Sequence, residues 1–283
     1  MTIKVLVTGG NGRLGHALSR IGGANVQGLS SAELDIIDAI AFRDALARFR
    51  PDAVINAAAL GVEASDMALE HARQVNALAP GHMAQTCGQA GTPFIHISTD
   101  YVFGNPTDRP WRETDPVSPI NTYGQLKAEG ERNVLANGHG VCVGRVAWLF
   151  GDGKDFIARL LQNQAHAVRV SHDQIGSPTP IFALAKRLLK VAERMNEGEA
   201  VPEILHLAGS PPVSRADWVA TAFETLPRAG KPVPQLVRVS MAEFGSAILR
   251  PNYSALDCRL AAHMFGGHLG WQPATMRPDM FAV

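Results

Sequence analysis

The chain has 283 residues, of which 46% are hydrophobic and 18% charged, and its 26 basic side chains balance 26 acidic ones. This composition is typical of a globular protein with one large α/β domain or two coupled smaller ones. A net charge of zero provides no general attraction for nucleic acid or for an anionic membrane, so local groups must hold any anionic ligand. The longest apolar runs, such as residues 53–60, are too short to cross a bilayer.

Cysteine and histidine usage predicts a reducing compartment and no metal. Cys87, Cys142 and Cys258 are widely spaced and form no CxxC pair, so we interpret them as small core residues of a cytoplasmic protein. The first residues run directly into a strand-like segment, unlike a signal peptide. The ten histidines form no HExxH or similar ligand spacing, and we therefore expect no structural or catalytic metal.

A glycine-rich loop follows the first predicted strand. Residues 3–7 are rich in β-branched side chains and residues 14–21 repeat apolar side chains at helical spacing, so the loop joins a strand to a helix. Glycine allows a tight turn and lets a pyrophosphate approach the backbone, while the helix N-terminus offers N–H groups to phosphate. A plain strand–helix turn is the alternative. We expect the dinucleotide contacts of this loop to be Gly9, Gly12, Arg13, Leu14 and Gly15.

The end of the second predicted strand bears on the choice of cofactor. Residues 25–29 form this strand, and Ser30 stands where many NAD-binding folds carry an acidic residue on the ribose hydroxyls. Serine removes a charge that would repel a 2′-phosphate, and Arg13 offers a cation. We therefore expect NADPH or NADH as cofactor, with NADPH tolerated or preferred. If Ser30 is only a turn residue, the discrimination between the two cofactors is slight.

Strands and helices continue to alternate up to residue 150, which predicts an α/β fold with a Rossmann-type, doubly wound parallel sheet. Ligands of such sheets lie beyond the carboxyl ends of the strands. The expected strands cover or end in residues 34–38, 53–59, 94–97 and 141–150, and the expected helices cover residues 39–49, 65–90 and 123–136. Residues at or near these strand ends complete the expected cofactor contacts, which are Asp35, Ile36, Ala57, Ala58, Ala59, Val75, Ser98 and Val146.

The alternation weakens after residue 150. We expect helices over residues 155–164 and 181–195, a strand over 204–207, and a helix over 214–223 with Ser214 as its N-cap. The expected domains are an NAD(P)-binding domain over residues 1–150, onto which about 178–208 packs back, and a smaller interleaved lobe, mainly substrate-binding, over 151–283.

A phenol and an ammonium group four residues apart stand out in the segment Tyr123-Gly-Gln-Leu-Lys127. On a helix this spacing places both side chains on one face. A neighbouring cation favours the phenolate, so we expect Lys127 to lower the pKa of Tyr123 towards the range useful for proton transfer to a carbonyl oxygen. The spacing also occurs by chance on amphipathic helices, but the glycine loop and the parallel sheet favour a catalytic pair. The polar, proline-rich loop over residues 104–116 is expected to cover the site.

Together these segments resemble the extended short-chain dehydrogenase/reductases, and closely the dTDP-4-dehydrorhamnose reductase branch, over nearly the whole chain. The motifs that carry the resemblance are residues 8–15, 98–103, 110–115, 118–119, 123–127 and 173–179, with Arg250, Pro251, Ser254 and Leu256.

The resemblance implies hydride transfer from the cofactor to C4 of a 4-keto-6-deoxy sugar nucleotide, with dTDP-L-rhamnose as the product by family precedent. Tyr123 would protonate the developing alkoxide, and Lys127 would bond the nicotinamide ribose, so both residues also contact the cofactor. Thr99 stands at the third catalytic position and would polarise the carbonyl oxygen. A strand-end residue that bonds its own backbone is the alternative for Thr99. Family members are monomers or homodimers.

The resemblance also implies sugar contacts for Thr99, Asp100 and Trp148, and a diphosphate contact for Arg250, whose N–H donors suit phosphate oxygens. A core role for Trp148 and a surface ion pair for Arg250 are the alternatives. The family usually carries a stretch like Thr-Ala-Val-Asp-Lys-Ala-Glu beside the sugar pocket, whereas residues 60–67 here read Leu-Gly-Val-Glu-Ala-Ser-Asp-Met, one residue shorter. This loop bears on which sugar is bound.

Two other functions fit parts of the pattern. A sugar-nucleotide dehydratase or epimerase of the same superfamily is one, but dehydratases need an Asp-Glu pair after the threonine, and here Asp100 is followed by Tyr101. A non-catalytic NADP-binding subunit is the other, because the regulatory β subunit of methionine adenosyltransferase resembles the same branch. Turnover of a 4-keto sugar nucleotide distinguishes the reductase from this binding protein.

Overall fold

The β-branched run near the N-terminus forms β1 (Val5–Thr8), and all four of its residues are buried. It lies between β2 (Val26–Leu29) and β3 (Ala53–Asn56), and both pairings are parallel. In turn, β3 pairs in parallel with β4 (Phe94–Thr99). These strands belong to a computed structural model that describes residues 3–162, 166–225 and 233–272.

Two further strands, β5 (Val141–Val146) and β10 (Ile204–His206), extend the sheet beyond β4. The strand order is β10-β5-β4-β3-β1-β2, so the chain builds outward from β1 to β2 and then returns to β3 on the other side. The carboxyl ends of β1 and β3 meet where this order reverses, which is where such sheets bind ligands. The six-stranded parallel sheet confirms the predicted Rossmann-type fold.

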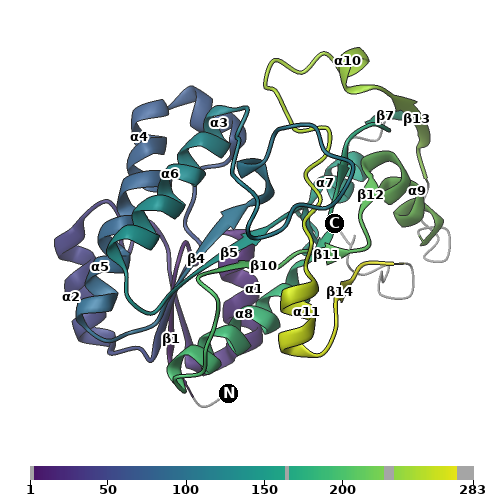
Figure 1. Cartoon of the computed structure of the whole chain (residues 1–283). Helices are drawn as coiled ribbons and strands as arrows, with labels where there is room; N and C mark the ends of the chain where they lie inside the picture. The colour runs from purple at the N-terminus through teal and green to yellow at the C-terminus, as the bar shows by residue number, and fades with distance from the viewer. Residues whose placement is uncertain (1–2, 163–165, 226–232, 273–283) are drawn as a thin grey trace. The chain divides into compact units, whose positions relative to one another are not determined.

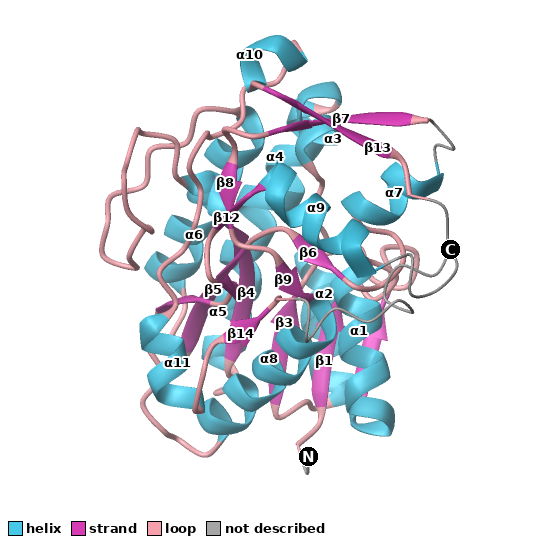
Figure 2. Cartoon of the chain, turned by 90° about the vertical axis from the view of Figure 1, so that its right-hand side faces the viewer, coloured by secondary structure: helices cyan, strands magenta, loops and turns pink. Residues whose placement is uncertain are grey.

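Helices cover both faces of this sheet (Figures 1 and 2). One face packs against α2 (Ala39–Phe49), α5 (Ala79–Gln89) and α6 (Thr122–Asn137), while α1 (Arg13–Gly22) and most of α8 (Ile181–Asn196) lie on the other. Burial of each large apolar side chain stabilises such a core by roughly 1.5–3 kcal/mol. Fully buried contributors on the first face include Leu6, Val54, Phe94, Phe42, Met83 and Val134.

The single helix expected over residues 65–90 is wrong. The chain forms α3 (Val62–Met67), α4 (Leu69–Arg73), a π-helical turn (Gln74–Leu78) and then α5. Ala68 separates the first two with non-helical dihedrals (φ −136°, ψ 60°). Pro80 lies at the start of α5 and has no N–H to donate, so it cannot continue an α-helical ladder, and the turn ahead of it is widened.

The strand end expected over residues 34–38 is also wrong. This segment is a turn in which the N–H of Leu34 donates to the carbonyl oxygen of Ser30. Asp38 is the N-cap of α2, because its carboxylate accepts from the N–H groups of Ile40 and Ala41, both at 2.9 Å. Leu34 and Ile36 are buried as expected of a strand, but they fill the core under α2 instead of pairing with the sheet.

The strand expected over residues 141–150 divides into β5 and the short β6 (Leu149–Phe150). Trp148 stands at the break with a left-handed backbone (φ +36°), which is unusual for a bulky side chain. β6 pairs with β9 (Thr179–Pro180) instead of continuing the main sheet. Two short 3₁₀ segments complete this half, at Gly23–Asn25 before β2 and at Asp100–Val102 after β4.

The remaining strands pair two by two. A parallel pair that the sequence did not predict joins β7 (Ala167–Ser171) to β13 (Gln235–Val239), side by side in Figure 2. β8 (Ile175–Gly176) pairs with β12 (Val213–Ser214) in antiparallel fashion. The last pair is parallel and joins β11 (Gly209–Ser210) to β14 (Leu269–Gly270).

In the C-terminal half, α7 (Phe156–Gln162) and α9 (Arg215–Thr225) begin close to the predicted positions. Two further helices follow them, α10 (Met241–Phe244) and α11 (Arg259–Phe265). Ser214 is confirmed as the cap of α9, since its Oγ accepts from the N–H of Asp217 at 3.0 Å. Residues 163 and 164 of the helix expected over 155–164 lie outside the described residues.

The chain folds into two compact units that alternate along the sequence. The first contains the residues up to Val102, Pro119–Arg145 and Ala185–Leu205. The second contains Phe103–Ser118, Val146–Leu184 and the residues from His206 onward. Apart from the strand ends at Val146 and His206, the main sheet belongs to the first unit. The apolar core of the second unit gathers around Trp218 between α7, α9 and β7.

The three cysteines are free thiols buried in the protein, as expected. Burial raises the pKa of the Cys87 and Cys142 thiols to about 12, so both stay protonated and unreactive near neutral pH. Among the helices of the described ranges, none has the length and apolar character needed to cross a membrane.

Candidate active site

The glycine loop between β1 and α1 is packed too closely for side chains. Gly9 has φ +71°, and a Cβ there would lie 2.7 Å from the Cα and N atoms of Ala58. A Cβ on Gly15 would lie 2.3 Å from the carbonyl oxygen of Gly9, so α1 rests directly on the loop. Gly12 caps α1, which leaves the N–H groups of the first turn and the positive end of the helix dipole for an anion.

A cavity of about 350 Å³ opens at this loop. Its walls come from the glycine loop, the end of β2, the turn after it, and the small residues after β3. The predicted cofactor contacts that line it are Gly9, Gly12, Ser30, Asp35, Ile36, Ala57, Ala58, Ala59 and Val75. The predictions missed Asn11, Ser31, Leu34, Leu60 and His71, which line it as well. The remaining predicted cofactor contacts do not line it: Arg13, Leu14, Gly15, Ser98, Tyr123, Lys127 and Val146.

A carboxylate lies at the end of β2 after all. Glu33 turns back onto Ser30 and accepts from its N–H at 2.8 Å and from its hydroxyl at 2.6 Å. These bonds lower the pKa of Glu33, so the group is a carboxylate at neutral pH. Ser30 itself removes a charge from its own position, but Glu33, three residues later, returns a negative charge next to it.

The catalytic candidates lie at the end of β4 and on the first turns of α6. Tyr123 is half-buried near the start of α6, and its side chain lies close enough to that of Thr99, the last residue of β4, for Thr99 to lower its pKa. The Thr99 hydroxyl donates to Oδ1 of Asp100 at 3.1 Å and accepts from the N–H of Tyr101 at 3.2 Å. The Tyr101 ring meets that of Tyr123 edge to face, with centroids 6.2 Å apart.

The pKa of Tyr123 is shifted in the direction opposite to the prediction. Burial raises this pKa above the usual value of a tyrosine, the Thr99 side chain partly offsets the rise, and the charge of Asp100 adds to it. Lys127 is not among the groups that shift it. The phenol is therefore protonated at neutral pH, which is the form that a proton donor needs.

Lys127 is on α6 with Tyr123, as the spacing predicted, and its side chain is only 1% exposed. Its Nζ donates to the carbonyl oxygen of Ile97 at 2.7 Å and lies 3.0 Å from Nε2 of His96. Burial lowers the pKa of Lys127 to about 8, and the charge of Glu131 acts against that shift.

A buried ion pair lies one helical turn beyond Lys127. The carboxylate of Glu131 accepts from Nε and Nη2 of Arg145 at 3.0 and 2.7 Å. Glu131, Arg145 and the neighbouring Ser98 are each at most 3% exposed. The Ser98 hydroxyl donates to the same carboxylate at 2.5 Å. Ser98, predicted as a cofactor contact, thus directs its hydroxyl to α6.

The substrate residues that the resemblance implied are divided between the units. Thr99 and Asp100 belong to the first unit, Trp148 and Arg250 to the second. Trp148 is half-buried and packs against the apolar core around Trp218. The guanidinium of Arg215 lies 3.8 Å from its ring centroid, and a Cβ on Gly176 would lie 2.3 Å from its Cε2. The Nη1 atom of Arg250 donates to Ser246 Oγ at 2.5 Å and to the carbonyl oxygen of Ile248 at 3.4 Å.

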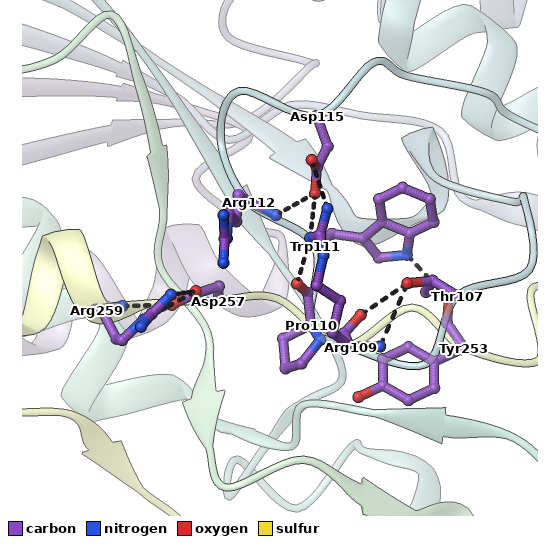
Figure 3. A network of polar contacts seen from close by, with 9 residues as sticks. All are labelled: Thr107, Arg109, Pro110, Trp111, Arg112, Asp115, Tyr253, Asp257 and Arg259. Atoms are coloured by element: carbon purple, nitrogen blue, oxygen red, sulfur yellow. Dashed lines mark hydrogen bonds and ion pairs between the residues drawn. The ribbon is translucent and has the colours of Figure 1, made fainter.

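Two motifs far apart in the sequence are paired in the second unit (Figure 3). Trp111 bridges to Leu256 as in a parallel sheet, and its indole Nε1 donates to the carbonyl oxygen of Tyr253 at 3.2 Å. Arg109 and Asp115 close the loop around Trp111 with a bidentate ion pair of 2.7 and 2.9 Å. The expected loop over residues 104–116 is therefore held against the segment that contains Arg250 by the bonds of Trp111 to Tyr253 and Leu256.

In the ranges 3–162, 166–225 and 233–272, no three His, Cys, Asp or Glu side chains form a group that could hold a metal ion. Two buried polar residues near Lys127, His96 and Asn56, were missed by the sequence predictions, because both stand inside apolar strands. The available signal was their position: each is a polar side chain near the carboxyl end of a buried strand, where ligands bind.

Comparison with known proteins shows the family of the chain. A family model described as the RmlD substrate binding domain matches residues 3–278. A dTDP-4-dehydrorhamnose reductase from Mycobacterium tuberculosis is 37% identical over 269 residues, which cover 90% of this chain and 85% of the relative. Another from Aggregatibacter actinomycetemcomitans is 31% identical over 274 residues, 93% of each chain. The crystal structure of the dTDP-4-dehydrorhamnose reductase from Bacillus anthracis in complex with NADP superposes with a TM-score of 0.83 at 27% identity, over 94% of both chains. The chain therefore belongs to the RmlD family of dTDP-4-dehydrorhamnose reductases.

Proposed function

We propose that this protein reduces the C4 carbonyl of a nucleotide-linked 4-keto-6-deoxy sugar, with dTDP-4-dehydro-L-rhamnose as the first candidate and dTDP-L-rhamnose as the product. As a member of its family it is an NAD(P)H-dependent oxidoreductase acting on a sugar nucleotide. The proposal adds the position of the carbonyl, the sugar, and the residues that carry out the reaction.

The proximity of the Thr99 and Tyr123 side chains carries this proposal. It places two hydroxyl groups together at the carboxyl end of β4, and Lys127 follows on the same face of α6. β4 is the neighbour of β3, whose end lines the cavity at the glycine loop. This arrangement supports a carbonyl group bound by Thr99 and Tyr123 beside a dinucleotide in that cavity.

The nicotinamide cofactor, when bound, supplies the hydride. The glycine loop fits a pyrophosphate, because Gly9 and Gly15 leave backbone where side chains would block its approach. Thr99 bonds the carbonyl oxygen and stabilises the negative charge that develops there. Tyr123, kept protonated by its raised pKa, gives its proton to that oxygen, because an alkoxide is a stronger base than a phenolate.

In the same proposal, Lys127 bonds the nicotinamide ribose, Asp100 and Trp148 contact the sugar, and Arg250 contacts the diphosphate. The ring of Trp148 suits a sugar face because Arg215 and Gly176 hold it in one orientation. We further propose that the protein works in the cytoplasm, in dTDP-rhamnose biosynthesis, as a monomer or homodimer.

Turnover tests the function. The purified protein is incubated with NADH or NADPH and each of a panel of 4-keto-6-deoxy sugar nucleotides, and oxidation of the cofactor is followed by absorbance. We expect turnover with the dTDP-linked sugar. Binding of NADPH without reduction of any member of the panel would contradict the proposal and favour a non-catalytic binding protein.

A further inference from the structure

A row of buried polar side chains crosses the sheet beneath the candidate active site. Thr8, Asn56 and His96 are direct partners in the register of β1, β3 and β4. They therefore point to the same face of the sheet, the one covered by α6, and none is more than 1% exposed. The row ends at Lys127, whose Nζ lies 3.0 Å from Nε2 of His96.

The amide of Asn56 has only one orientation that satisfies its neighbours. Its Oδ1 accepts from the hydroxyl of Thr8 at 2.7 Å and from the backbone N–H of Ala58 at 3.2 Å. A backbone N–H can only donate, so this side of the amide must be the oxygen. The Nδ2 group, a donor, then faces Nδ1 of His96 at 3.2 Å, and Nδ1 must be the unprotonated nitrogen of the ring.

A neutral imidazole with a bare Nδ1 carries its proton on Nε2. This proton points at Lys127, so the lysine must accept it with a lone pair that only the neutral amine has. We propose that His96 donates its Nε2 proton to Nζ of Lys127 and holds this lysine as a neutral amine, so that His96 is a positioning residue for Lys127. If the lysine were an ammonium, two donors would face each other somewhere in the row.

The charged surroundings of Lys127 agree with this assignment. His96 faces it from β4, where burial lowers the pKa of the imidazole well below its usual value, so the ring itself stays neutral. Glu131 on α6 attracts an ammonium, but Arg145 from β5 already neutralises that carboxylate. Tyr123, on the same helix, is kept in its neutral form by burial. Burial lowers the pKa of Lys127 in the same sense.

The consequence for catalysis rests on the proposed function. A lysine that turns from His96 to new acceptors, such as ribose hydroxyls, no longer faces the Nε2 proton and can take up a proton from solvent to become an ammonium. Ala58 lines the cofactor cavity and also fixes the amide of Asn56, so the row joins the cavity wall to the lysine. The neutral form assigned to Lys127 follows from its bond partners in the protein and does not rest on the identity of the substrate.

Nuclear magnetic resonance of the folded protein tests the proposal without any substrate. The ring nitrogens of ¹⁵N-labelled histidine report the tautomer, and the ¹³Cε signals of the six lysines report their titration. We expect His96 to carry its proton on Nε2 and Lys127 to titrate far below the other lysines. The His96 signals are assigned by their loss in His96→Gln or, if that chain does not fold, in His96→Asn. The Lys127 signal is assigned with Lys127→Met.

His96→Gln also tests the cause. The glutamine amide can turn its oxygen towards the lysine and accept from an ammonium, so we expect the pKa of Lys127 to rise by about one unit, a tenfold change in its ammonium fraction at a given pH. His206→Gln is the matched control, since His206 is equally buried and belongs to the second unit; it should leave Lys127 unchanged. A proton on Nδ1 of His96, or the same Lys127 titration in wild type and His96→Gln, would overturn the proposal. A protein without reductase activity that shows the expected tautomer and shift would contradict only the proposed function.

Discussion

Burial acts in opposite directions on the pKa values of Tyr123 and Lys127. It raises that of the phenol and lowers that of the lysine to about 8, because in each case it penalises the charged form. The spacing of the two residues in the sequence predicted a phenolate of Tyr123 stabilised by an ammonium of Lys127. The structure instead disfavours the charged form of each group, and the neutral phenol is the form that can give a proton away.

Replacement of Tyr123 by phenylalanine removes the proton donor and leaves the ring. We expect kcat to fall by about 10²–10⁴-fold, the usual contribution of proton-transfer catalysis, with little change in the dissociation constant of the cofactor. Steady-state kinetics and cofactor titration of the same preparation measure both quantities. Wild-type turnover of Tyr123→Phe would remove this residue from the chemistry.

Glu33→Gln removes the negative charge of the carboxylate that is bonded to Ser30, a residue lining the proposed cofactor cavity. We expect kcat/KM for NADPH to rise about 2- to 10-fold relative to NADH, because two charges a few ångströms apart in water interact by about 1 kcal/mol. Glu243→Gln is a matched control, since Glu243 accepts from the N–H and hydroxyl of Ser240 in the same way but in the second unit. Equal ratios in all three proteins would show that Glu33 does not discriminate.

At the scale of elements, the spacing of side chains along one face of α6 matches the spacing along one face of β4. Four residues of helix advance about 6 Å and two residues of strand about 6.6 Å, so side chains at these spacings stay opposite each other. Lys127 and Glu131 on the helix accordingly meet His96 and Ser98 on the strand. The helix therefore presents two polar contacts to the sheet in one register, and a shift of one residue would separate both.

The buried pair of Glu131 and Arg145 makes this register costly to disturb. Glu131→Gln leaves the arginine charge uncompensated in the interior, and we expect the free energy of unfolding to fall by about 3–5 kcal/mol. Glu129→Gln on the exposed side of α6 breaks the surface pair with Arg73 and should cost less than about 1 kcal/mol. Urea unfolding of both variants measures the difference. Equal losses would mean that the buried pair is not held as described.

The sequence was sufficient to predict those helices and strands whose hydrophobic pattern and flanking turn residues agree with how they pack in the fold. β1, β4 and α6 were predicted because buried runs and a Tyr–Lys motif stand between clear turn signals. Residues 34–38 were mistaken for a strand because two of them are buried and alternate with polar residues, although turn bonds hold them. The role of His96 could not be predicted, because it depends on β3 lying beside β4, a fact of tertiary structure.

At the scale of the whole molecule, Lys127 should make stability depend on pH. Its pKa is about 8 in the folded protein and 10.5 as an ordinary lysine, so the unfolded chain binds this proton more tightly. Burial of the lysine therefore lowers stability by roughly 3 kcal/mol below about pH 8, and the loss disappears as the pH rises towards about 10.5.

Lys127→Met removes this titration while the cysteines and Tyr123 stay in both proteins, so their contributions cancel in a comparison. We expect the stability of Lys127→Met relative to wild type to fall by roughly 3 kcal/mol between about pH 8 and 10.5, as the wild type recovers its loss. Denaturant unfolding at several pH values measures the difference. A difference that does not change with pH would contradict the lowered pKa of this lysine.

The alternation of the two units along the chain has a consequence for synthesis on the ribosome. β5 is completed at Val146, but its outer neighbour β10 begins only at Ile204, after a stretch of which the part up to Leu184 belongs to the other unit. Until then the nascent chain carries an apolar strand with one unpaired edge, the kind of edge that joins other chains. A truncated product that ends before residue 204 should therefore aggregate even though its glycine loop and its Tyr–Lys pair are complete.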